Sequence, residues 1–162
     1  MAQIFISLGS NVNKEHYLRQ ALIALKPYFP DFVHSSVYES EAVGFAGSNF
    51  YNSVVAAKTD MPLEKLCKLL KQIELDNGRT RADKKFSPRT LDLDLLFYDD
   101  VICDYPAQLP RDEITKNAFV LQPLAEIAPD FFHPVAKLTL AQLWDNYDNP
   151  QQKLWKVEFT NP

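Results

Sequence analysis

Residues 91–97 have the sequence LDLDLLF, in which leucine and aspartate alternate. Side chains alternate along a strand, so its three alternate leucines share one face while Asp92 and Asp94 share the other. We therefore predict a strand with one apolar face and one carboxylate face.

Working outward, we predict further strands at 3–8, 32–39 and 50–59, which are alternating or rich in β-branched and aromatic residues. One helix is expected between Asn13, as its cap, and Pro27, and a second between Pro62 and Gly78. The resulting β-α-β-β-α-β order predicts a ferredoxin-like sheet with helices on one face.

The C-terminal third is predicted to add smaller pieces, since prolines recur there. Thr139 and Gln142 have the spacing of a capping box that begins a helix. Alternation at 155–159 predicts a closing edge strand. We expect a single domain of the α/β (α+β) class over residues 1–162.

Composition narrows the class of function. Seventeen Lys and Arg against 21 Asp and Glu give a net charge of −4, which disfavours a general nucleic-acid or anionic-membrane binder. No apolar run is long enough for a membrane span, and no signal peptide is recognisable at the N-terminus. Two cysteines without metal-ligand spacing suit a reducing compartment, so we expect a cytoplasmic protein.

Glycine is scarce. The chain has four, at positions 9, 44, 47 and 78. They cannot form the P-loop or the dinucleotide-binding glycine pattern. Phosphates would have to be bound by side chains and metal.

Asp92 and Asp94 are candidate metal ligands. Two residues apart on a strand, their Cα atoms lie about 6.6 Å from each other. At an effective dielectric near 20, two such charges repel by roughly 3 kcal/mol, which a cation would relieve. Mg²⁺ binds a few carboxylate oxygens together with water and phosphates. The alternative is a solvated strand face with two exposed acids.

The segment RTRADKKFSPR at 79–89 precedes this strand and carries a net charge of +4. Basic groups beside a carboxylate pair can enclose a phosphate between guanidinium and metal. The alternative is a solvated, flexible loop. If the segment binds phosphates, we expect it to be mobile in the free protein and to close over a bound triphosphate.

Two further features have equally open interpretations. Glu74 continues the inward stripe of the second helix, and a structural ion pair with Arg79 or Arg81 explains it as well as a ligand does. Asn52 is a short amide beside Phe50 and Tyr51, whose rings are more often core than ligand platforms.

Several motifs together resemble 6-hydroxymethyl-7,8-dihydropterin pyrophosphokinase, an enzyme family of folate biosynthesis. They are FSPRTLDLDLL (86–96), IExxxGRxR (73–81), ESEAVG (39–44), AFVLxPLAEIAP (118–129) and ISLGSN (6–11). The likeness covers nearly the whole chain. It implies a ferredoxin-like fold without a P-loop and transfer of the β,γ-diphosphate of ATP to the hydroxymethyl oxygen of the pterin, leaving AMP.

The resemblance also implies residue roles. On the phosphate side, Asp92 and Asp94 would hold two Mg²⁺ ions, with catalytic Arg79 and Arg89 stabilising charge, and Arg81, Lys85, Arg111, Glu74 and Leu95 binding the nucleotide. On the pterin side, Phe50 and Phe119 would sandwich the ring, with Asn52 and the segment Ser40, Glu41, Ala42 and Val43 at its edge. Apolar faces and a few edge partners are what a flat polar heterocycle requires.

The sequence departs from the family pattern at a few positions. Arg111 stands where many members have His, Asn117 where a basic residue is common, and Phe86 where some have Trp. Glu41 replaces a residue that is often proline or small. These departures concern nucleotide affinity and loop closure rather than the reaction class.

Two other functions stay open at this point. One is a pterin- or nucleotide-binding relative without turnover, against which the presence of both aspartates and both catalytic arginines speaks. The other is an RNA-binding ferredoxin-like module, which the net negative charge disfavours. We expect small-molecule substrates, no nucleic-acid or membrane partner, and a monomer.

Overall fold

The computed structural model describes residues 1–41, 49–78 and 90–162. Its main sheet contains β1 (Ala2–Ser10), β2 (Val33–His34), β3 (Val37–Ser40), β4 (Phe50–Thr59), β5 (Asp92–Tyr98) and β8 (Leu154–Val157). The helices are α1 (Lys14–Leu25), α2 (Leu63–Asp76), α3 (Ala118–Ile127) and α4 (Leu140–Asn146). A 3-10 helix η1 (Asp112–Thr115) precedes α3, and a small hairpin pairs β6 (Phe132–His133) with β7 (Leu138–Thr139).

The strands run in the order β5-β1-β4-β3-β8, with β2 also paired to β4. Every pairing is antiparallel. The first four strands of this order, joined through α1 and α2, confirm the predicted ferredoxin-like topology. β8 closes the sheet beside β3, which confirms the predicted C-terminal edge strand.

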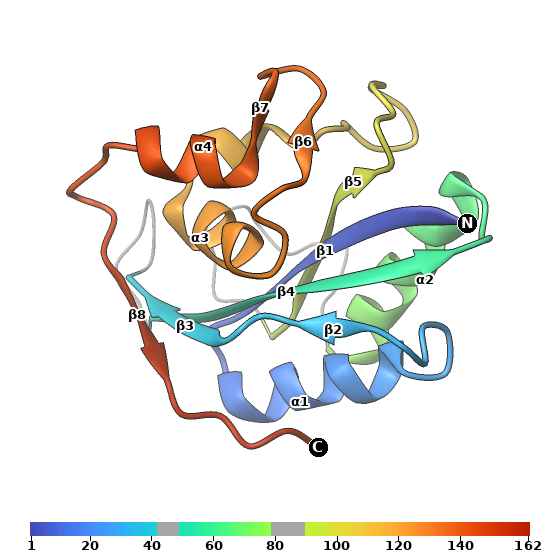
Figure 1. Cartoon of the computed structure of the whole chain (residues 1–162). Helices are drawn as coiled ribbons and strands as arrows, with labels where there is room; N and C mark the ends of the chain where they lie inside the picture. The colour runs from blue at the N-terminus through green and yellow to red at the C-terminus, as the bar shows by residue number, and fades with distance from the viewer. Residues whose placement is uncertain (42–48, 79–89) are drawn as a thin grey trace.

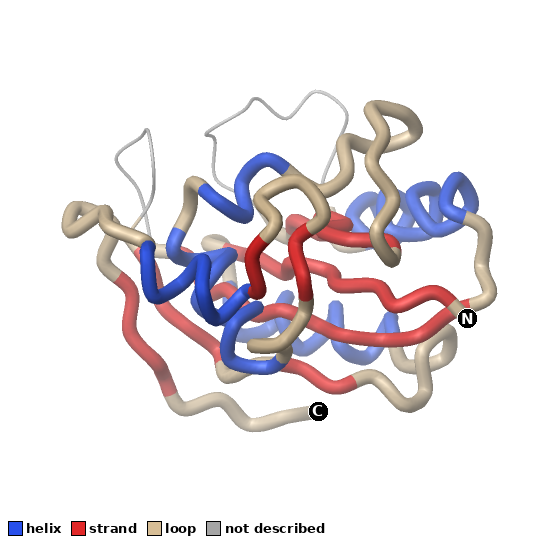
Figure 2. Tube along the Cα trace, turned by 45° about the horizontal axis from the view of Figure 1, so that its top comes forward, coloured by secondary structure: helices blue, strands red, loops and turns tan. Residues whose placement is uncertain are grey.

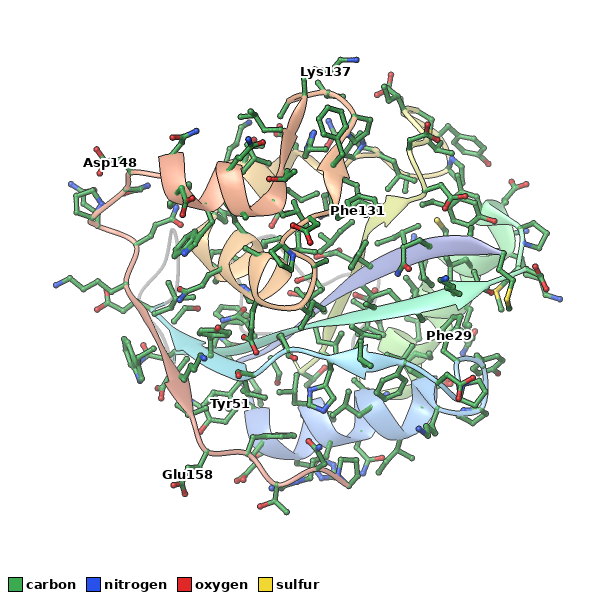
Figure 3. The ribbon with its side chains drawn as sticks, viewed as in Figure 1. Phe29, Tyr51, Phe131, Lys137, Asp148 and Glu158 are labelled. Atoms are coloured by element: carbon green, nitrogen blue, oxygen red, sulfur yellow. The ribbon has the colours of Figure 1, made fainter. Side chains whose placement is uncertain are left out.

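Helices cover both faces of the sheet, which corrects the expectation that they lie on one face (Figures 1 and 2). α1 and α2 bury one core against Ile4, Ile6 and Leu8 of β1. α3 and α4 bury a second core on the opposite face, against Phe5 and Val54. Figure 3 shows Tyr51 on the α1 side and Phe131 on the α3 side.

The predicted strand 32–39 is two short strands, because Ser35 interrupts the backbone pairing with β4. The buried Ser35 hydroxyl accepts a hydrogen bond from Val54 N–H at 3.0 Å, while Ser35 N–H donates to Val54 O at 2.9 Å. α3 was not predicted at all. It contains Pro123, which normally marks the end of a helix, and burial of its apolar residues outweighs this effect.

The ends of the helices are partly as predicted. Thr139 and Gln142 form both hydrogen bonds of the capping box of α4. Gly78 follows α2 with φ +89°, a conformation that favours glycine. Asn13 stands at the N-cap of α1, but its side chain caps nothing and its backbone is left-handed, with φ 46°. No helix in the described ranges is long and apolar enough to cross a membrane.

Candidate active site

The acidic pair lies on the sheet face that α3 and α4 cover. Leu93 and Leu95 point into the core beneath α1 and α2, so alternation along β5 directs Asp92 and Asp94 to the opposite side. Both aspartates are partly exposed. The predicted division of this strand into an apolar and a carboxylate face is confirmed.

Glu74 connects the last turn of α2 to this strand. It is 9% exposed, and its Oε2 accepts a hydrogen bond from Leu93 N–H at 2.8 Å. β5 is the first strand in the sheet order, so this carboxylate provides a partner for a backbone amide on an edge strand. Glu74 therefore fixes the backbone between the two aspartates.

Arg111 reaches the acidic pair from the segment before η1. Its Nη2 lies 3.4 Å from Asp94 Oδ1 and 2.9 Å from Glu113 Oε1, and its Nε also donates to Glu113 Oε1 at 3.2 Å. Arg111 N–H donates to Leu96 O at 3.1 Å, which anchors the segment to β5. The residue that departs from the family pattern is thus a cation held beside a candidate metal ligand.

The donor set of this site fits magnesium. Among the described residues, no group of three or more His, Cys, Asp or Glu gathers in the way a protein-only metal cage requires. Mg²⁺ instead uses one or two carboxylates and takes its remaining ligands from water and substrate phosphates. Asp92 and Asp94, adjacent on one strand face and partly exposed, meet that requirement.

A second group of polar residues lies on the same face, on β4 and β3, which are two and three strands away from β5. Asn52 and Ser40 are each 4% exposed, and Asn52 Nδ2 donates to Ser40 Oγ at 2.7 Å. Ser40 is directly opposite Phe50 in the β3–β4 pairing. Residues directly opposite each other in antiparallel strands share a face, so these three candidate pterin residues lie together.

Gly9 joins the two groups. It pairs with Asp92 on one side and with Asn52 on the other, forming a row across β5, β1 and β4. A Cβ atom at position 9 would lie 3.7 Å from Asn52 Oδ1, 3.9 Å from Phe50 Cδ1 and 4.0 Å from Asp92 Cβ. Gly9 is buried and places no side chain between these three. No role was predicted for this residue.

A cavity of about 280 Å³ is lined by Ser40, the hydrogen-bond partner of Asn52 at one end of this row. Its lining includes Ser40, Glu41 and Phe119, three of the residues predicted on the pterin side, but neither Phe50 nor Asn52. The lining is completed by Ala118, Asn149, Gln151, Gln152, Lys153 and Leu154. The five C-terminal residues were not predicted, because no pattern in their sequence indicates a ligand.

The remaining predicted residues are placed as follows. Leu95 is 4% exposed in the α1–α2 core, and its contact with a nucleoside stays a prediction. Outside the described residues lie Arg79, Arg81, Lys85, Arg89, Ala42 and Val43. Phe86 and the predicted closure of segment 79–89 also fall there. Asn117 stands at the N-cap of α3.

Comparison with known proteins identifies the family of the chain. Residues 5–129 match the family model of 7,8-dihydro-6-hydroxymethylpterin-pyrophosphokinase. A 2-amino-4-hydroxy-6-hydroxymethyldihydropteridine pyrophosphokinase of Aquifex aeolicus is 35% identical over 145 residues, covering 88% of this chain and 90% of the relative. A Bacillus subtilis protein of the same name is 39% identical over 128 residues, covering 76% of each.

Among solved structures, an HPPK-DHPS triple mutant of Plasmodium falciparum superimposes with a TM-score of 0.71 at 16% identity. The match covers 90% of this chain and 43% of that longer chain, and it supports the fold alone. From the family-model match and the sequence relatives, the chain belongs to the 7,8-dihydro-6-hydroxymethylpterin-pyrophosphokinase family.

Proposed function

We propose that the chain transfers the β,γ-diphosphoryl group of ATP to the hydroxymethyl oxygen of 6-hydroxymethyl-7,8-dihydropterin, in folate biosynthesis. Family membership and the names of its relatives support the reaction. The observation that carries the proposal in the structure is the row Asp92, Gly9 and Asn52 across three neighbouring strands. Neighbouring strands are about 4.8 Å apart, so the acidic and amide ends of the row are about 10 Å apart.

The ring end of the row can bind the pterin. Phe50 and Phe119 would contact its two faces, and the Asn52 amide would hydrogen-bond its edge. Ser40 accepts one of the two amide protons of Asn52, which fixes the orientation of that side chain. Ala42 and Val43 are proposed as further edge partners by the family resemblance.

The acidic end can bind the triphosphate through metal. Asp92 and Asp94 would hold Mg²⁺, for which we propose two ions. When bound, the metal would neutralise phosphate charge and align the donor with the acceptor. Glu74 holds the backbone of this strand in place through Leu93 N–H, and its proposed second role is contact with the nucleoside.

Cationic side chains would neutralise the charge on the transferring group. Arg111 lies next to Asp94 and can reach a phosphate bound there. We propose Arg79 and Arg89 as the groups that stabilise the transition state, and Arg81 and Lys85 as further phosphate ligands. Such transfers need alignment and charge stabilisation more than covalent chemistry.

The reaction balances without further reactants. The hydroxymethyl oxygen forms a bond to the β-phosphorus, and the bond from that phosphorus to the oxygen it shares with the α-phosphate breaks. AMP leaves with that oxygen, and the hydroxyl proton passes to solvent. We propose that the protein acts as a cytoplasmic monomer on these small-molecule substrates.

Product analysis tests this proposal. With ATP, Mg²⁺ and the reduced hydroxymethylpterin, we expect AMP and pterin diphosphate in equal amounts by chromatography. ADP as the nucleotide product would indicate transfer of a single phosphoryl group and contradict the proposal. Tight pterin binding without AMP would identify a binding relative that lacks turnover.

A further inference from the structure

The C-terminal segment returns after α4 to the cavity that Ser40 and Phe119 line. It descends from α4 to β8 along the β3 edge of the sheet (Figure 1). Five of its residues, at positions 149 and 151–154, line the cavity that Phe119 also lines. This segment lies beyond residues 5–129, the part of the chain that matches the family model.

Gln152 attaches this segment to the start of α3. Its Oε1 accepts a hydrogen bond from Ala118 N–H at 2.7 Å, and its Nε2 donates to Lys116 O at 3.1 Å and to Asn117 Oδ1 at 3.3 Å. The amide therefore uses its acceptor and its donors on three consecutive residues. Gln152 itself is partly buried.

The contact with Ala118 replaces a local helix cap. The first N–H groups of a helix have no partner within the helix, and a side chain at the N-cap usually supplies one. Asn117 occupies the N-cap of α3, but its side chain makes no capping hydrogen bond. Gln152, 34 residues further along the chain, supplies that acceptor.

Tyr147 supports the same contact. Its hydroxyl lies 2.7 Å from Lys116 O and 2.9 Å from Gln152 Oε1 and can donate to either. A tyrosine hydroxyl carries its proton at neutral pH, and burial raises the pKa of Tyr147 further above that range. The start of α3 is therefore held by two side chains from the C-terminal part of the protein.

The other end of α3 is attached to the sheet independently. Glu126 accepts hydrogen bonds from Tyr38 OH at 2.6 Å and from Ser36 N–H at 3.0 Å, on and beside β3. Loss of the Gln152 contact would release the first turn of α3 and leave its last turn in place. That first turn carries Phe119.

We propose that Gln152 is a positioning residue for pterin binding. It fixes the first turn of α3, and with it the ring of Phe119, and it holds residues 149–154 as a wall of the pocket. This inference rests on the proposed function, because it takes Phe119 to contact the pterin. It assigns a binding role to a part of the chain that the family resemblance left without one.

Steady-state kinetics of Gln152→Leu test this role. We expect the KM for the pterin to rise about tenfold, because the partly buried Ala118 N–H loses its partner, and the KM for ATP to stay within about twofold of the wild type. Gln152→Glu keeps an acceptor for Ala118 N–H but loses both N–H donors. Its KM for the pterin should therefore lie between those of the wild type and of Gln152→Leu. The matched control is Gln72→Leu on α2, where an exposed glutamine loses its hydrogen bond to Asp76.

Two readouts separate positioning from general destabilisation. Amide hydrogen exchange at residues 118–120 should accelerate in Gln152→Leu and stay unchanged in Gln72→Leu. In a double-mutant cycle, Phe119→Ala and Gln152→Leu should have non-additive effects on pterin affinity, because one residue acts through the other.

Provided that the wild-type protein turns over, any of three results would overturn the inference. They are additive effects in the double-mutant cycle, an equal rise in the KM values for pterin and ATP, and unchanged amide exchange at residues 118–120 in Gln152→Leu. Absence of AMP release by the wild-type protein would instead overturn the proposed function and, with it, this role. The two failures are therefore distinguishable.

Discussion

Replacement of Gly9 by alanine should separate stability from function. The added methyl group would lie at 3.7–4.0 Å from Asn52, Phe50 and Asp92, which is ordinary van der Waals contact. The backbone at Gly9 does not have the positive φ that disfavours alanine, unlike Gly78 at +89°. The folded protein without ligands should therefore accept this change.

The expected effects on stability and binding have opposite signs. Alanine restricts the unfolded chain more than glycine does, so the free energy of unfolding should rise by about 0.4–1 kcal/mol. The same methyl group would lie 3.7 Å from Oδ1 of Asn52, the amide that a bound pterin would contact. Overpacking of this kind costs about 1–3 kcal/mol, so pterin affinity should fall about five- to 150-fold.

Urea unfolding of the protein alone and fluorescence titration with the pterin measure the two effects. Gly78→Ala is the control for the sign of the stability change, because its left-handed backbone should make that variant less stable. If Gly9→Ala binds the pterin as tightly as the wild type, the ring does not lie over this row. A large loss of stability would show that the position is already fully packed.

Three further predictions concern single residues. Arg111→Gln should tighten Mg²⁺ binding about fivefold in calorimetry without ATP, because a partly exposed ion pair of about 1 kcal/mol no longer competes for Asp94. Unchanged Mg²⁺ affinity would show that the guanidinium does not compete with the metal. Phe119→Ala should weaken pterin binding by about 1–3 kcal/mol and barely alter nucleotide binding, and equal losses for both would show that Phe119 is core. Burial lowers the pKa of His133, whose Nδ1 accepts from Val135 N–H and Ala136 N–H, so the unfolded state binds a proton more readily than the folded state. The free energy of unfolding should therefore fall as the pH decreases below about 6.5. His133→Asn keeps an acceptor without titrating, so a decrease of the same size in that variant would assign it to other groups.

Sequence reasoning predicted the elements whose side-chain pattern is set locally. The alternation in 91–97, the turn at Gly78 and the capping box at Thr139 depend on neighbours within a few residues, and all three were confirmed. The topology followed from the order of the elements, since antiparallel β-α-β-β-α-β segments have few ways to pair.

The elements that sequence reasoning missed depend on distant contacts. α3 contains a proline and is stabilised by burial on the sheet, and its first N–H group is capped by Gln152, which is far away in the sequence. Ser35 breaks a predicted strand because its hydroxyl bonds Val54 on the neighbouring strand. No local pattern reports such contacts.

The sequence likewise predicted only part of the candidate site. Spacing alone placed Asp92 and Asp94 on one face, and the family resemblance added Ser40, Asn52 and Phe119. Gly9 and the C-terminal wall of the cavity were missed, because their importance comes from strand register and from the path of the chain.

The positions of the metal and of the pterin ring in a ternary complex would show whether the row across β5, β1 and β4 is the active site. A crystal of the protein with Mn²⁺ in place of Mg²⁺, a non-hydrolysable ATP analogue and the pterin would show metal positions by anomalous scattering. We expect Mn²⁺ to be coordinated by the carboxylates of both Asp92 and Asp94, and the pterin ring to lie between Phe50 and Phe119 beside Asn52. Metal bound away from both aspartates, or a pterin on the α1–α2 side of the sheet, would contradict it.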